Sequence, residues 1–89
     1  PPLLHRPAAD GNTVWLCRRA GLLYIKVYDD GRLRAAEVVA AADEAEIRYL
    51  AERFDAVFPL RGYTLLAAGD DPKALRKLLG KRFRKVVCE

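Results

Sequence analysis

The fold is decided by residues 13–40, which read TVWLCRRAGLLYIKVYDDGRLRAAEVVA. Apolar and polar residues alternate on both sides of Ala20-Gly21, and an alternation with period two indicates half-buried β-strands. Ala20-Gly21 and Asp29-Asp30-Gly31 are typical of hairpin turns, because each has a glycine where the backbone needs a positive φ. The stretch therefore predicts three antiparallel strands, at residues 13–19, 22–28 and 32–40.

The apolar spacing becomes helical after residue 42. Asp43 and Glu46 have the spacing of a capping box, in which the first residue caps a helix and the second reaches back to it. Pro59 and Gly62 then end the helix. Its expected buried stripe consists of Ile47, Leu50, Ala51, Phe54 and Val57.

A second helix is expected between the last two strands. Asp71 stands at the position of a cap, Pro72 suits the first helical position, and Gly80 ends the helix. Short apolar runs at residues 63–68 and 84–88 predict the remaining strands. The element order is thus β-β-β-α-β-α-β, which is typical of the α/β class.

The simplest sheet with this order is five-stranded and mixed, with its strands in the spatial order 3-2-1-4-5. Crossovers between parallel strands are right-handed. Since both crossovers run in the same direction across the sheet, both helices are expected on one face. This order of elements over residues 13–88 resembles the core of ribonuclease H-like domains, which also occurs in actin-like and release-factor-like modules. No family motif accompanies the resemblance.

Length and composition are those of one small globular domain. We place it at residues 13–89 of the 89-residue chain, after an N-terminal arm at residues 1–12. No apolar run approaches the roughly 18 residues of a membrane helix, so we expect a cytoplasmic protein with no membrane partner. The chain has no Ser, Gln or Met, and depletion of thermolabile side chains is a thermophile trend.

The two turns predict which side chains share the face that the helices leave uncovered. The first turn pairs Trp15 with Lys26, and a three-residue second turn pairs Lys26 with Arg34. Leu33 and Glu37 then face the core, so the third strand is expected to bulge or leave the sheet near Glu37. The uncovered face collects three rings and three cations: Trp15, Tyr24, Lys26, Tyr28, Arg32 and Arg34.

Aromatic rings interleaved with cations are how sheets bind single-stranded nucleic acid, because bases stack on the rings and phosphates meet the cations. Lys26 opposite Arg34 is also an unfavourable like-charge pair that a bound anion would relieve. Two other interpretations stay open. Trp, Tyr and Arg are enriched at protein interfaces, so the face also fits a protein partner or a homodimer. The N-terminal arm is a third candidate to cover it.

The C-terminal end of the chain carries its net charge of +4. No acidic residue occurs between residues 72 and 88, where seven cations lie: Lys73, Arg76, Lys77, Lys81, Arg82, Arg84 and Lys85. A one-sided basic cluster is typical of a phosphate-binding surface, whereas a solvated helix face usually mixes both signs. This segment favours nucleic acid as the partner over protein.

The sequence shows no catalytic or metal-binding pattern, and we expect no enzymatic activity, no metal and no cofactor. A ribonuclease H-type nuclease needs clustered carboxylates, one of them on the first strand, but residues 13–19 contain no acid. His5, Cys17 and Cys88 lack zinc-ligand spacing. The fourth strand separates the two cysteines by more than disulfide reach, so we expect free thiols.

The sequence therefore predicts a domain that binds single-stranded DNA or RNA with low sequence specificity. The alternative is a non-catalytic interaction or structural subunit that meets a partner, or a second copy, through the same face.

Overall fold

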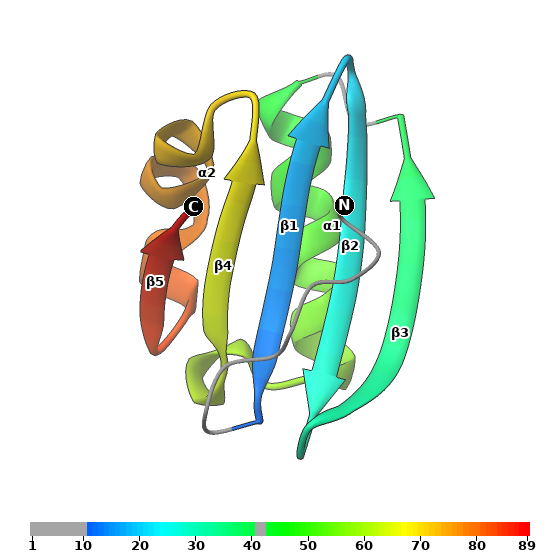
Figure 1. Cartoon of the computed structure of the whole chain (residues 1–89), viewed down its shortest axis with the longest axis vertical. Coiled ribbons are helices and arrows are strands. Elements are labelled where there is room, and N and C mark those ends of the chain that lie inside the picture. Colours follow the sequence, from blue (N-terminus) through cyan, green and yellow to red (C-terminus); the bar gives the residue numbers. More distant parts are fainter. Residues whose placement is uncertain (1–10, 41–42) are drawn as a thin grey trace.

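The computed structural model describes residues 11–40 and 43–89, which form five strands and two α-helices (Figure 1). The strands are β1 (Thr13–Arg19), β2 (Leu22–Asp29), β3 (Arg32–Val39), β4 (Thr64–Gly69) and β5 (Lys85–Cys88). The helices are α1 (Glu44–Val57) and α2 (Pro72–Leu79), followed by the short 3-10 helices η2 (Leu60–Gly62) and η3 (Gly80–Arg82). Residues 1–10 of the predicted N-terminal arm lie outside the described residues.

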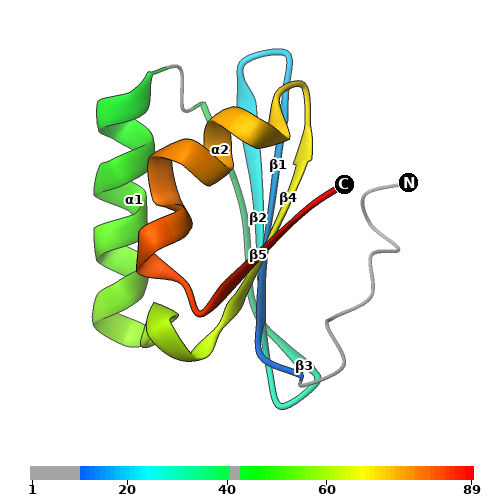
Figure 2. The same cartoon turned by 90° about the vertical axis from the view of Figure 1, so that its left-hand side faces the viewer.

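The strands form one mixed sheet in the order β3-β2-β1-β4-β5, as the element order predicts. The β1–β2 and β2–β3 pairs are antiparallel, and the β1–β4 and β4–β5 pairs are parallel. Figure 2 shows the sheet edge-on, with α1 and α2 on the same side of it. The predicted fold class is confirmed, including the placement of both helices on one face.

Both hairpins turn in two residues. Ala20 and Gly21 have φ of 51° and 80°, and Asp30 and Gly31 have φ of 55° and 76°. Two successive residues with positive φ match the right-handed twist of the flanking strands. The second turn is therefore one residue shorter than the predicted one, because Asp29 is still part of β2.

The register of β2 against β3 differs from the predicted one, whereas that of β1 against β2 is confirmed. Trp15 lies opposite Lys26 as expected. Tyr28 lies opposite Leu33 because the β2–β3 register shifts at a bulge, which leaves Arg34 without a partner position in β2. An extra residue in one strand reverses the side-chain faces on one side of the bulge. Residues of β3 before the bulge therefore face opposite to the prediction.

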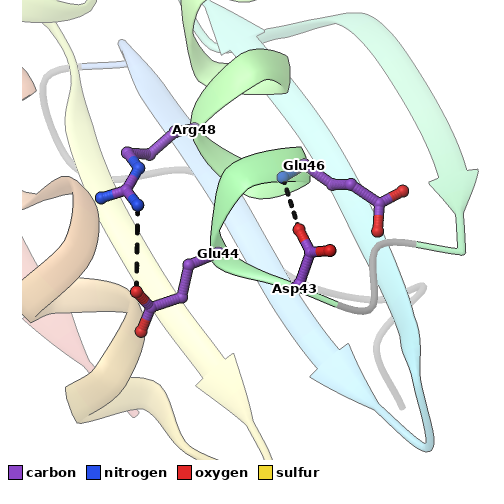
Figure 3. Close-up of polar contacts among 4 residues, drawn as sticks. All are labelled: Asp43, Glu44, Glu46 and Arg48. Atoms are coloured by element: carbon purple, nitrogen blue, oxygen red, sulfur yellow. Dashed lines mark hydrogen bonds and ion pairs between the residues drawn. The ribbon is translucent and has the colours of Figure 1, made fainter.

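The helices begin where their caps predict. The Glu46 backbone N–H donates to an Asp43 carboxylate oxygen at 2.9 Å, which satisfies one of the open donors of the first turn of α1 (Figure 3). On the adjacent surface, the Arg48 Nη2 lies 4.0 Å from the Glu44 Oε1, one turn earlier in α1. The backbone N–H of Ala74 donates in the same way to the Asp71 side chain at 3.2 Å.

The main core lies between the sheet and the two helices. The sheet contributes alternate residues of its three central strands, and the helices contribute one stripe each. The buried members are Val14, Leu16, Leu23, Ile25, Val27, Ile47, Leu50, Ala51, Leu60, Tyr63, Leu65, Ala67, Leu75, Leu79 and Phe83. Among the described residues, neither helix is long and apolar enough to cross a membrane.

Cys17 and Cys88 are free thiols, and β4 lies between their strands.

Candidate interaction surface

The face opposite the helices is buried at its centre, contrary to the prediction. Trp15 is only 2% exposed and packs with Cys17, Leu66 and Ala68 in a second apolar cluster. Tyr28 is also buried. Strand alternation assigns these residues to one face, but it carries no information on whether that face meets solvent. A base has no access to a ring that is already covered, so these two rings form no exposed stacking platform.

Lys26 and Tyr24 complete this part of the predicted site and are both half-buried. The Lys26 Nζ lies 5.3 Å from the centroid of the Trp15 ring, which is a cation–π distance. Tyr24 packs against the second cluster. The structure thus brings Trp15, Tyr24, Lys26 and Tyr28 together, as predicted, but as a packed group and not as a solvent-facing one.

Arg32 and Arg34, the other two predicted members, do not lie beside Lys26 on the face away from the helices, because Lys26 is opposite Ala36. Arg32 is opposite Asp29, one position beyond Tyr28 and therefore on the other face. Burial raises the pKa of the Tyr63 hydroxyl, and the Asp29 carboxylate raises it further, whereas Arg34 lowers it. Arg34 is the bulged residue of β3 and has no opposite position in β2. The predicted Lys26–Arg34 pair does not exist.

The basic C-terminal residues lie around the edge formed by α2 and β5. They do not form one continuous surface with the aromatic residues of β1 and β2. Lys73, Arg76 and Lys77 are exposed on α2, on the helix side of the sheet. Lys85 is opposite Thr64, on the other face. The two sets of cations are therefore separated by the sheet itself.

Part of this positive charge has a partner, which the sequence alone did not reveal. The Arg82 guanidinium lies 3.7 Å from the Glu52 carboxylate of α1. The Arg84 guanidinium donates a hydrogen bond to the Thr64 hydroxyl at 3.1 Å. Lys81 is exposed on η3. The exposed cations of α2 and η3 remain the part of the predicted phosphate-binding surface that solvent reaches.

A different surface gathers around β3, which the prediction did not single out. Leu33 and Val38 are 54% and 57% exposed on the face opposite the helices. Tyr49 and Val57 of α1 are 63% and 70% exposed, although helical spacing placed Val57 in the core. Six large apolar side chains are exposed in the described part of the chain, and Val87 alone among them lies far from β3: Leu22, Leu33, Val38, Tyr49, Val57 and Val87.

A shallow groove runs between β3 and α1 on the helix side. The groove has two parts that meet at Arg53. Glu46 lines one part and Glu37 lines the other. The apolar lining of the groove consists of Ala35, Val39, Ala40, Ala45, Tyr49, Leu50, Phe54, Ala56, Val57 and Phe58. The groove exists because α1 covers the central strands and leaves β3 beyond it (Figure 1).

The backbone of β3 has one open side. Among the described strands it pairs with β2 alone, and it is eight residues long. An edge strand presents N–H and C=O groups that a further strand can pair with. We name the open side of β3, the exposed Leu33 and Val38, and the groove lined by Tyr49 and Val57 the β3 edge.

The described residues contain no group of three or more His, Cys, Asp or Glu side chains that could hold a metal ion. No family model and no curated protein matches the sequence. The chain is similar to a crystal structure from Bacteroides thetaiotaomicron of a protein with an actin-like ATPase fold and unknown function. The TM-score is 0.71 at 17% sequence identity, over 94% of this chain and 34% of that one. The chain thus spans about a third of that protein's length, and the likeness shows the α/β fold alone.

Proposed function

We propose that this chain is a non-catalytic interaction module that binds a polypeptide along the β3 edge. What supports the proposal is one observation: apolar side chains are exposed on one face of an eight-residue strand whose outer side is open among the described strands, and on the helix that borders its other face. Contiguous exposed apolar surface marks interaction sites in folded proteins. Two free cysteines suit a reducing compartment such as the cytoplasm, where we place the protein.

The mode of binding that fits this edge is strand addition. Main-chain hydrogen bonds to the open side of β3 supply affinity, and pockets for alternate side chains supply specificity. Alternate residues of an added strand would point into the groove lined by Tyr49 and Val57, and the others would lie beside Leu33 and Val38. The ligand is therefore an extended segment with apolar residues on both of its faces.

Peptides selected from a random phage-displayed library would test this proposal. We expect the selected peptides to be rich in β-branched and aromatic residues and to slow hydrogen exchange of the β3 amides. Val38→Lys places a charge on the edge and should abolish binding. Val87→Lys is the matched control, because Val87 is an exposed valine on the same face of the other edge strand. Peptide binding that is indifferent to Val38→Lys would refute the proposal.

A second candidate function rests on the exposed cations of α2 and η3. The acid-free run of residues 72–88 favours low-specificity binding of single-stranded DNA or RNA through phosphate contacts. Because Trp15 is covered, this binding would depend on charge and not on stacking. Replacing Lys73, Arg76 and Lys77 with Gln should then reduce the slope of log binding constant against log salt concentration by about 0.7 per lost phosphate contact. Replacing Arg48, Arg53 and Arg61 with Gln is the control. If both sets of replacements reduce the slope equally, the cations of α2 form no specific site, and only generic attraction between a basic protein and nucleic acid remains.

A further inference from the structure

The sequence of β3 is complementary to itself when it is read in the opposite direction. Residues 32–39 are RLRAAEVV: two alanines lie at the centre, Arg34 and Glu37 flank them with opposite charges, and Leu33 and Val38 come next. We infer that the polypeptide bound at the β3 edge is a second copy of this chain, paired antiparallel through β3. This inference rests on the proposed function and names the partner.

The bulge at Arg34 makes this pairing consistent with the side-chain faces. Directly opposite residues of an antiparallel pair lie on the same face. Ala36 faces away from the helices, as does Val38, whereas Glu37 faces the helix side. When a two-fold axis passes at Ala36, the second copy's Glu37 lies opposite Ala35 and the bulged Arg34.

Beyond the bulge the pairing skips Arg34, and residues that lie opposite each other still face the same side of the sheet. Leu33 then lies opposite the second copy's Val38, with both side chains on the face away from the helices. By symmetry each contact occurs twice, so the interface contains two Leu33–Val38 contacts and two Arg34–Glu37 pairs. Without the bulge, Leu33 would itself face the helix side and lie opposite the second copy's Val39, so the Leu33–Val38 contacts would not form.

The neighbouring registers fit less well. An axis at Glu37 places two carboxylates directly opposite each other, which is destabilising. An axis at Ala35 moves Val38 opposite the second copy's Asp30-Gly31 turn, where both residues have positive φ and no strand continues. The axis at Ala36 avoids the carboxylate pair and keeps Val38 opposite a strand residue, Leu33, while Glu37 meets Arg34 of opposite charge.

The pairing also accounts for the groove on the helix side. A second β3 added to the first continues the sheet beneath the open side of α1. The grooves of the two copies then adjoin across the two-fold axis, and Tyr49 and Val57 of both copies lose exposure together. The exposed Leu33 and Val38 of β3 and the exposed Tyr49 and Val57 of α1 thus become covered in a single step.

Sedimentation equilibrium over a concentration series tests the inference on the 89-residue chain. We expect the mass to rise from 10.0 kDa towards twice that value. Glu37→Arg and Arg34→Glu should each raise the dimer dissociation constant about tenfold, because each variant sets two like-charge pairs against each other. The double variant Arg34→Glu/Glu37→Arg should return it to within about threefold of the original. Lys73→Glu on α2 is the control and should leave it unchanged.

Hydrogen exchange provides a readout that does not depend on mass. The outward amides of β3 should exchange more slowly at high than at low protein concentration, and those of β5 should not change. A chain that stays monomeric to millimolar concentration overturns the inference, as does a dimer in which the double variant is weaker than both single variants. If the monomeric chain still binds selected peptides at β3, the proposed function survives. If it binds none, both fail.

Discussion

Trp15→Ala should remove a large part of the stability of this domain. Trp15 is 2% exposed and packs with three apolar residues in the second cluster. Truncation of a buried tryptophan to alanine costs about 3–5 kcal/mol, because the apolar contacts are lost and a cavity remains. Loss of the Lys26 contact at 5.3 Å from the ring is included in that range.

The total stability of small domains is about 5–15 kcal/mol, so the expected loss is readily measured. Urea unfolding followed by circular dichroism gives the change in the free energy of unfolding, and the melting temperature should fall by about 12 °C or more. Lys77→Ala is the control, since an exposed side chain on α2, away from the β3 edge, should contribute within about 0.5 kcal/mol.

The fluorescence of the wild-type protein provides a second measurement, because Trp15 is its only tryptophan. We expect iodide to quench this emission weakly in the folded state and strongly in urea. A loss below about 1 kcal/mol for Trp15→Ala, together with strong quenching in the folded state, would refute the burial argument. It would restore the solvent-facing platform that the sequence predicted.

Three further outcomes follow from single residues. Gly69→Ala should destabilise the domain by several kcal/mol in urea titrations, roughly as strain and overpacking do, because Gly69 has φ of +94° and a Cβ there would collide with the β1 backbone. Gly62→Ala, with open space around the Cβ position, should be nearly neutral. Because Tyr63 keeps its proton to a higher pH in the folded state, stability should fall as pH rises through the ordinary tyrosine pKa of about 10 and up to the raised value; a Tyr63→Phe variant that keeps this slope would contradict the assignment. A thiol reagent should modify Cys88 in the folded protein and reach Cys17, which is 1% exposed, only on unfolding.

The order of the elements could be predicted from the sequence because each boundary has a local chemical signal. Glycine turns, the caps Asp43 and Asp71, and the change of apolar period are all short-range features. The β1–β2 register followed from the Ala20-Gly21 turn alone. The β2–β3 register did not, because a short turn followed by a bulge has the same residue count as a longer turn without one. The position of Arg34 relative to Lys26 depends on that choice.

The candidate site was harder to predict, because exposure depends on what lies above a residue. Period-two alternation places Trp15 and Val38 on the same face, yet one is 2% and the other 57% exposed. Helical spacing likewise places Val57 in line with Phe54, but only tertiary packing decides where the covering sheet ends. The sequence feature on which the proposed pairing rests is an edge strand whose charges have opposite signs at symmetric positions, Arg34 and Glu37.

The two edges of the sheet differ in a way that limits polymer growth. A sheet with two receptive edges can add copies indefinitely, as in fibres. The β5 edge is four residues long and begins at the exposed Lys85, a few residues after the exposed Lys81 of η3. A strand approaching this side meets positive charge and little backbone. The proposed two-fold contact at β3 would use the receptive edge of each copy, so growth would end at two chains.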